Sequence, residues 1–136
     1  NDPNKIGLQK FKDTYKDMWL KCRVGKYLLE TLGKEIVMQK MFFCNICKCS
    51  SPSNSQLEKE EIENCKPYLE KQIEIIKPKV ILSFGGEANA VMKSMFLKGI
   101  PLFTMLHPSF IFRRGDATIS KKQYNEINTI IQKYNI

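Results

Sequence analysis

Two short, uninterrupted apolar runs constrain the fold of this chain more than any other feature of its sequence. They span Val80 to Phe84 and Pro101 to Leu106. Runs without polar alternation are typical of strands that are buried on both faces of a sheet. Gly85 and Gly86 interrupt the first run, and a helical pattern over Glu87 to Phe96 separates it from the second. A strand, a helix and a strand in this order predict a parallel sheet.

Three further stretches have apolar side chains at helical spacing. They lie at residues 24 to 33, at Leu57 to Ile76 and at Lys121 to Tyr134. A spacing of three or four residues places these side chains on one face of a helix. Pro67 falls inside the second stretch, so we expect that helix to be kinked or broken there.

A third strand is predicted at Phe42 to Cys47, a short run of apolar and aromatic side chains. The chain has 136 residues and is 43% hydrophobic, which suits one domain with a core of ordinary size. We therefore expect a single α/β domain over residues 1 to 136, with a central parallel sheet covered by helices on both faces.

Charge and cysteine content limit which binding partners and which cellular compartment we expect. The net charge of +8 and the pI near 9.3 favour a polyanion such as nucleic acid, although a basic solvated surface would look the same. No apolar run reaches the roughly 18 to 20 residues of a membrane span, so no membrane partner is expected. The cysteine count of 5 is odd, and the crowding over Cys44 to Cys49 suits metal or reduced thiols. We expect an intracellular protein of the cytoplasm, nucleus or an organelle matrix.

Polar and glycine residues follow the predicted strands. Ligands of parallel α/β sheets bind beyond the carboxyl ends of the strands. Asn45, Gly85 and His107, which is the only histidine, all lie at or near such ends. The sequence therefore predicts that these three residues converge on one edge of the sheet.

Four motifs between residues 40 and 114 occur in a characteristic order. They are FFCNICKC from residue 42, CKPYLEKQI from residue 65, KPKVILSFG from residue 77 and HPS from residue 107. In order and spacing they resemble the uracil-DNA glycosylase superfamily, most closely its iron–sulfur branch, family 4. The sheet of that superfamily begins with one more strand, which this chain lacks. Either the sequence is a fragment, or the domain is built differently at that edge.

The resemblance implies a monofunctional DNA repair glycosylase that hydrolyses the bond between uracil and its sugar. Asn45 stands where the family reads the flipped base, and one amide offers both a donor and an acceptor. His107 stands where the family donates to uracil O2 as negative charge develops there. Asp2, with Pro3, resembles the first motif, where it would orient water or stabilise the sugar cation. The alternatives are an Asn at a turn, a structural His and an ordinary Asp-Pro turn.

The segment after His107 is implied to grip DNA. Apolar side chains there would wedge into the base stack, and polar or cationic ones would hold phosphates. The residues concerned are Ser109, Phe110, Ile111, Phe112, Arg113 and Arg114. In the alternative, Phe110 and Phe112 alternate with Ile111 along a strand and belong to the core.

The cysteines resemble the iron–sulfur branch only in part. Cys49 and Cys65 align with two of the four ligands of its [4Fe–4S] cluster, and the other two have no counterpart before the first motif. Cys65 on an apolar helix face is also explained as a small core residue. A zinc site formed by Cys44, Cys47, Cys49 and Cys65 is a further alternative.

A different class of function also fits these observations. The degenerate first motif and the incomplete cysteine set suit a catalytically inactive relative. Such a protein would bind DNA or RNA, or serve as a structural subunit of a larger complex.

Overall fold

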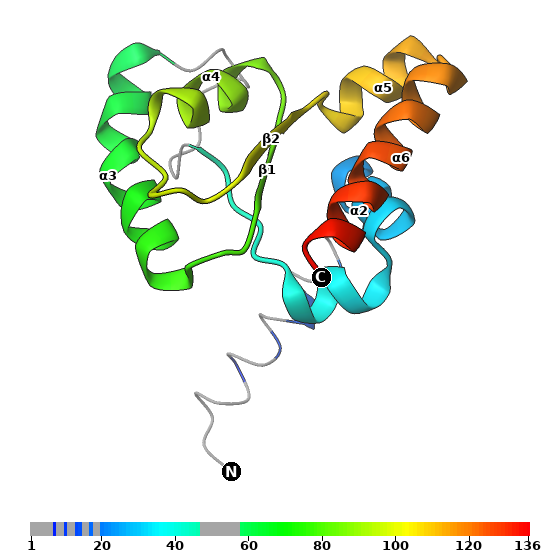
Figure 1. Ribbon diagram of the computed structural model, residues 1–136, viewed down its shortest axis with the longest axis horizontal. Coiled ribbons are helices and arrows are strands. Elements are labelled where there is room, and N and C mark those ends of the chain that lie inside the picture. Colours follow the sequence, from blue (N-terminus) through cyan, green and yellow to red (C-terminus); the bar gives the residue numbers. More distant parts are fainter. Residues whose placement is uncertain (1–6, 8–9, 11–12, 15–16, 18–19, 47–57) are drawn as a thin grey trace. The chain divides into compact units, whose positions relative to one another are not determined.

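The structure is a computed structural model that describes residues 20–46 and 58–136, with single positions at residues 7, 10, 13, 14 and 17. The chain forms two compact units (Figure 1). The sheet unit spans Phe42–His107, and the helical unit combines the residues up to Met41 with Pro108–Ile136. Compactness does not decide whether either unit folds alone, so the expected single domain stays a prediction.

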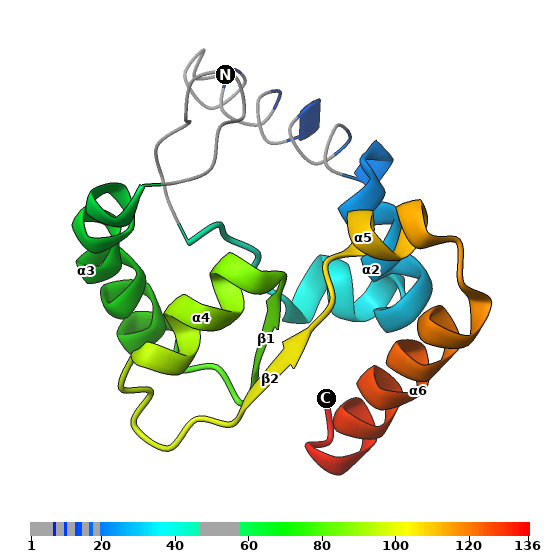
Figure 2. The same cartoon turned by 90° about the horizontal axis from the view of Figure 1, so that it is seen from above.

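The sheet unit contains the predicted strand, helix and strand. β1 (Ile81–Phe84) and β2 (Leu102–Met105) are parallel neighbours. α4 (Gly86–Ser94) connects them and contacts both strands (Figure 2). The α/β class expected from the two apolar runs is therefore confirmed.

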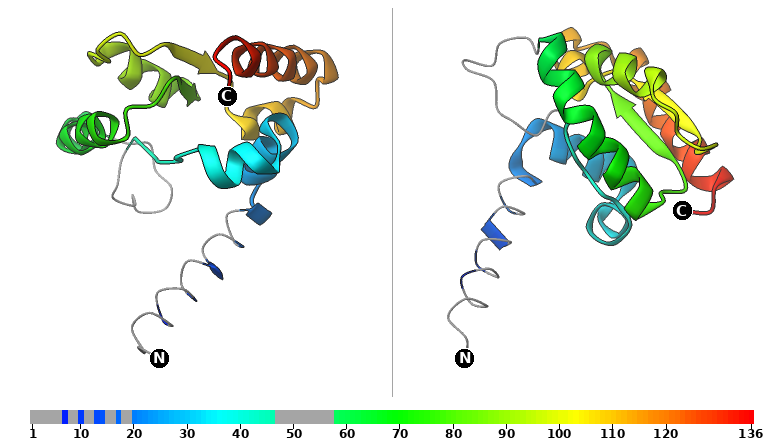
Figure 3. Two further views of the ribbon diagram at one scale, coloured as in Figure 1. Left: turned by 60° about the horizontal axis from the view of Figure 1, so that its bottom comes forward. Right: turned by 90° about the vertical axis from the view of Figure 1, so that its left-hand side faces the viewer.

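The core of the sheet unit lies where α4 meets α3 (Lys59–Ile76) (Figure 3). Leu69 of α3 is buried with Val91 and Met92 of α4 and with Met95. Ile81 of β1 and Leu102 of β2 are among the residues that pack against this cluster. The helical spacing of apolar residues thus places one face of α3 and one face of α4 in a common core.

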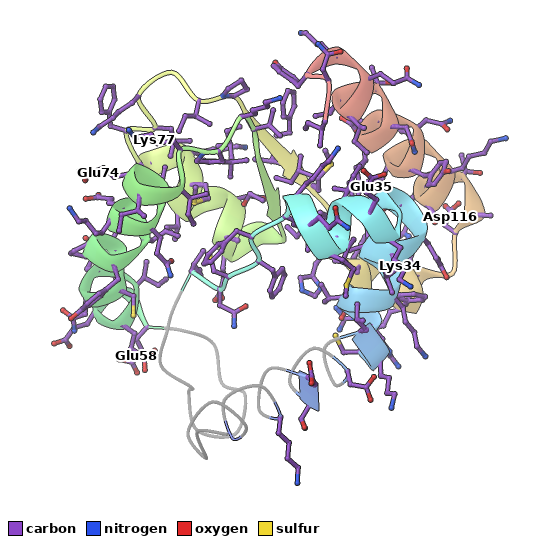
Figure 4. The ribbon with its side chains drawn as sticks, turned by 90° about the horizontal axis from the view of Figure 1, so that it is seen from below. Lys34, Glu35, Glu58, Glu74, Lys77 and Asp116 are labelled. Carbon is purple, nitrogen blue, oxygen red and sulfur yellow. The ribbon has the colours of Figure 1, made fainter. Side chains whose placement is uncertain are left out.

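α3 ends as the sequence predicts but is not broken by its proline. Figure 4 labels Glu58, just before the helix begins, and Lys77, just after it ends. The N–H of Glu58 donates to the Glu61 carboxylate at 2.9 Å, and Lys77 adopts a left-handed φ of 50° before Pro78. The helix is continuous through Pro67, so the break expected there is wrong, and the kink expected as the other outcome stays a prediction. The buried residues Cys65 and Leu69 flank Pro67 and hold both halves of the helix to the core.

The helical unit is built around α2 (Arg23–Leu32), which contacts α5 (Pro108–Arg114) and α6 (Ala117–Lys133). A π-helical turn, η1 (Ile36–Lys40), follows α2. Leu28 and Ile127 are almost fully buried, and Gln123 Nε2 donates to the Tyr27 hydroxyl at 2.8 Å. Within the described part of the chain, no helix is both long and apolar enough to cross a membrane.

The strand expected at Phe42 to Cys47 is not present in the described residues of that segment. Met41 has extended dihedral angles, but residues 41–46 join no sheet, and Phe42 and Phe43 are exposed. A strand needs a neighbour that completes its backbone hydrogen bonds, and an apolar run alone does not reveal whether one is present. Cys47 lies outside the described residues.

Candidate active site

The carboxyl ends of the two parallel strands lie side by side. The N–H of Gly85, directly after β1, donates to the carbonyl oxygen of Met105, the last residue of β2, at 3.0 Å. Gly85 has a φ of +93° and is the N-cap of α4. Only glycine adopts this φ without strain, so the glycine lets the chain turn from strand to helix within one residue.

His107 packs against this turn. A Cβ atom placed on Gly85 would lie 3.4 Å from His107 Cβ and 3.5 Å from His107 Cδ2. The imidazole edge is therefore close to the backbone at the start of α4, and His107 is only half-buried. The sequence predicted that Asn45, Gly85 and His107 would converge at the strand ends, and the structure brings Gly85 and His107 together there.

Asn89 joins the same site and was not found by sequence reasoning. Its Nδ2 donates to the Met105 carbonyl oxygen at 3.1 Å. That oxygen therefore accepts two hydrogen bonds, one from Gly85 and one from Asn89. The only signal in the sequence is an asparagine in the first turn of a helix, and such asparagines are common enough to pass unnoticed.

Asn45 lies in the sheet unit, on the extended segment and not at the end of a strand. Its side chain is exposed. The next residue, Ile46, packs against the core formed by α3 and α4. Asn45 is therefore adjacent to a residue fixed on the core of the unit that contains His107.

α5 carries the residues expected to grip DNA. It is a helix, so the strand-like alternative for Phe110 and Phe112 is wrong. Pro108 and Ile111 are buried, whereas Phe110, Phe112, Arg113 and Arg114 are exposed. Arg113 Nε donates to the Ser109 carbonyl oxygen at 3.3 Å. The helical period separates one buried face from one solvent face, which the sequence pattern alone did not reveal.

Further cations lie on α6. An open surface hollow of about 430 Å³ is lined by Ala117, Thr118, Lys121, Lys122 and Asn125. Both lysines are exposed, and only Gly115 and Asp116 separate α6 from Arg114 in the chain. None of the residues predicted for catalysis lines this hollow, so it is a feature of the helical unit's surface.

The described cysteines do not form a metal site. Cys65 is buried on α3, Cys44 is exposed, and Cys22 caps α2 by accepting the Gly25 N–H at 3.3 Å. Among the residues that the structure describes, no three His, Cys, Asp or Glu side chains gather as metal ligands. Cys47 and Cys49 lie outside these residues, so the [4Fe–4S] cluster and the zinc alternative stay predictions, and no chemical step is assigned to either.

Asp2, Cys47 and Cys49 lie outside the described residues. The predictions that Asp2 acts on the sugar and that Cys49 ligates a cluster stay predictions.

The fold and these strand ends define an α/β protein with a histidine at the carboxyl edge of a parallel sheet. The sequence model of the Uracil DNA glycosylase superfamily matches residues 10–132. The chain therefore belongs to this superfamily, as its four motifs indicated. No solved structure matches the chain significantly.

Curated relatives place it near one branch. A type-4 uracil-DNA glycosylase from Sulfurisphaera tokodaii is 42% identical over 105 residues, which cover 76% of this chain and 44% of that one. One from Pyrobaculum aerophilum is 40% identical over 73 residues, or 52% of this chain and 37% of that one. One from Thermotoga maritima is 31% identical over 106 residues, which cover 67% of this chain and 55% of that one. The resemblance to family 4 is thus confirmed, and the chain spans less than half the length of the first two relatives.

Proposed function

We propose that this chain is a DNA glycosylase that hydrolyses the bond between uracil and deoxyribose. The observation that carries the proposal is the packing of His107 against Gly85 at the carboxyl edge of the parallel strands. Ligands of parallel α/β sheets bind at this edge. Relatives named type-4 uracil-DNA glycosylases, up to 42% identical, supply the reaction class.

His107 stabilises the departing base in this proposal. Breaking the glycosidic bond leaves negative charge on uracil, and a fixed N–H directed at O2 stabilises that charge as it develops. A neutral imidazole is sufficient, because it carries one N–H donor. The closeness of His107 to the backbone at Gly85 restricts where the ring lies, which reduces the reorganisation needed during the reaction.

Asn45 reads the base. Its amide NH₂ donates to uracil O4, and its carbonyl oxygen accepts from N3–H. The exposed position of Asn45 makes the amide accessible to a base that has left the stack. The next residue, Ile46, packs against the core, which fixes the backbone from which the Asn45 side chain extends toward the base.

DNA is held by the helical unit. Phe110 and Phe112 present exposed rings that fill the space left in the base stack, and Arg113 and Arg114 bind phosphates. Ile111 is buried and instead anchors α5, so its role in DNA binding is indirect. The compartment that fits this function is one that contains DNA.

Single-turnover release of uracil from an oligonucleotide with one uracil tests the proposal. We expect the wild type to release uracil and His107→Ala to be slower by on the order of a hundredfold, with DNA affinity nearly unchanged. Asn128→Ala is a matched control, because it deletes an exposed amide bonded to Tyr124 on α6. A wild type that binds DNA but releases no uracil would instead support the catalytically inactive, nucleic-acid-binding alternative.

A further inference from the structure

The carbonyl group of Met105 lies at the end of β2, just before the chain reaches His107. Met105 is buried at the end of β2, and His107 follows two residues later. The pairing of β1 with β2 ends here with one backbone bond, from Gly85 N to Met105 O. Among the described residues the pairing of the two strands ends at Met105, so hydrogen bonds to its carbonyl oxygen orient the last peptide plane of β2. Any rotation of this plane redirects the chain toward the imidazole.

Asn89 supplies the second bond that fixes this plane. Its Nδ2 lies 3.1 Å from the Met105 oxygen, and its own N–H donates to the Gly85 carbonyl at 2.9 Å. Gly85, Asn89 and Met105 therefore form a closed set of three hydrogen bonds. A Cβ atom placed on Gly85 would lie 3.5 Å from Cδ2 of the His107 imidazole, so this set of hydrogen bonds lies next to the ring.

The oxygen of the Asn89 side-chain amide indicates why this position holds an asparagine. Asn89 Oδ1 is buried and has no hydrogen-bond partner among the described residues. A buried acceptor without a donor is unfavourable, so a leucine of similar size would suit the fold better at this position. The only favourable interaction that we assign to the asparagine side chain is the hydrogen bond from its NH₂ group to the Met105 carbonyl oxygen.

We propose that Asn89 is a positioning residue for His107, which it orients through the Met105 carbonyl without touching the base. The role of Asn89 in catalysis rests on the function proposed above, whereas its role in orienting the His107 ring does not depend on that function. The two statements therefore fail under different results.

The chain has 1 histidine, so the imidazole signals in a nitrogen-15 NMR spectrum belong to His107 without further assignment. We expect Asn89→Leu and Asn89→Ala to shift or broaden these signals in the absence of DNA. Asn89→Leu keeps the volume and should leave the melting temperature unchanged or higher. Ser94→Ala is the matched control, because it removes another side-chain bond on α4, from Ser94 Oγ to the Val91 carbonyl, away from the strand ends. Its imidazole signals should match those of the wild type.

Turnover provides the second measurement. In Asn89→Leu we expect kcat for uracil release to fall about tenfold, with KM within about twofold, because misplacement of a donor affects the transition state more than binding. A purely structural role would instead lower the melting temperature and leave kcat per folded molecule unchanged.

Unchanged imidazole signals in both Asn89 variants would overturn the proposal, whatever the activity. If neither variant folds, hydrogen exchange in the wild type decides, because the Asn89 amide proton bonded to Met105 should exchange slowly. Fast exchange of both Asn89 amide protons would overturn the proposal. If the wild type releases no uracil, the function fails, but shifted imidazole signals still support the orienting role.

Discussion

At the scale of single residues, Gly85 performs two tasks that substitution can separate. Its φ of +93° suits only glycine, and its missing side chain leaves the backbone against His107. An added Cβ would make ordinary contacts with His107, at 3.4 Å from its Cβ and 3.5 Å from Cδ2 of the imidazole, so the φ and not a clash sets the energetic cost.

We expect Gly85→Ala to lower the free energy of unfolding by about 1–2 kcal/mol through backbone strain. Gly99→Ala is a close control, because Gly99 has a φ of +82° and nothing within 4 Å of an added Cβ. Both variants should lose similar stability in urea titrations, but only Gly85→Ala should also slow uracil release. Equal activities would show that the contact between Gly85 and His107 is unimportant for the reaction.

Asn45 gives a prediction about which base is released. Asn45→Asp replaces the NH₂ donor that faces O4 with an acceptor, which repels uracil and accepts the exocyclic amine of cytosine. Uracil release should drop by on the order of a hundredfold and slow cytosine release should appear. Oligonucleotides that differ only in this base provide the measurement. Asn45→Ala, which offers neither group, should lose uracil release without gaining cytosine release.

Sequence reasoning located His107 and Gly85 because strand ends are visible as the ends of apolar runs. It missed Asn89, since a side-chain bond to a carbonyl sixteen residues away leaves no trace in local pattern. The same limit explains why the strand expected at residues 42–47 is wrong for the described residues 42–46. Local apolar character was visible there, but the partner that a strand requires was not.

At the scale of elements, local sequence signals predicted where helices form more accurately than the residues at which they begin and end. α6 begins at Ala117, before the expected Lys121, because Asp116 caps it by accepting the N–H of Thr118 at 2.9 Å. Figure 4 labels Asp116 at this end of α6. The cap precedes the apolar periodicity by several residues, so periodicity alone placed the start too late.

One buried polar bond joins two helices of the helical unit and should make its stability depend on pH. Burial raises the pKa of Tyr27 above the usual 10.0, the hydrogen bond from Gln123 lowers it, and the charge of Glu126 raises it. The folded state thus favours the neutral phenol. This contribution to stability is complete below pH 10.0 and is lost as the pH rises through the higher folded pKa.

We therefore expect the wild type to lose stability above about pH 10, where the unfolded phenol ionises more readily than the folded one. Tyr27→Phe should cost about 1 kcal/mol at neutral pH, because it removes the hydroxyl that accepts from Gln123, and should remove this part of the alkaline loss. Urea titrations at neutral and alkaline pH give both numbers. Tyr134→Phe, a change at the end of α6, serves as the control. An alkaline loss that is identical in wild type and Tyr27→Phe would contradict the assignment.

At the scale of the whole molecule, the proposed roles divide between the two units. His107 and Asn45 belong to the sheet unit, and the candidate DNA-binding residues of α5 belong to the helical unit. His107 and Pro108 are consecutive residues on either side of this division. Chemistry on the base and grip on the DNA are thus assigned to separate compact units, and substitutions in one should leave the other's function measurable.

The net charge of +8 predicts that the affinity for DNA depends on salt concentration. Four exposed cations of the helical unit, Arg113, Arg114, Lys121 and Lys122, lie on α5 and the first half of α6. If each neutralises one phosphate, affinity should fall on the order of a hundredfold between about 50 and 200 mM salt.

Each substitution of one of these four cations by alanine should reduce the slope of log affinity against log salt by about 1, at any DNA sequence. Lys71→Ala is the matched control, because Lys71 lies on α3 in the sheet unit with Glu74 at 3.6 Å. Its slope should equal that of the wild type, since an ion pair already compensates its charge. Fluorescence anisotropy of a labelled oligonucleotide over a salt series measures all five variants. If Lys71→Ala changes the slope as much as Arg113→Ala does, the attraction comes from the overall charge, and α5 and α6 do not form a defined DNA-binding surface.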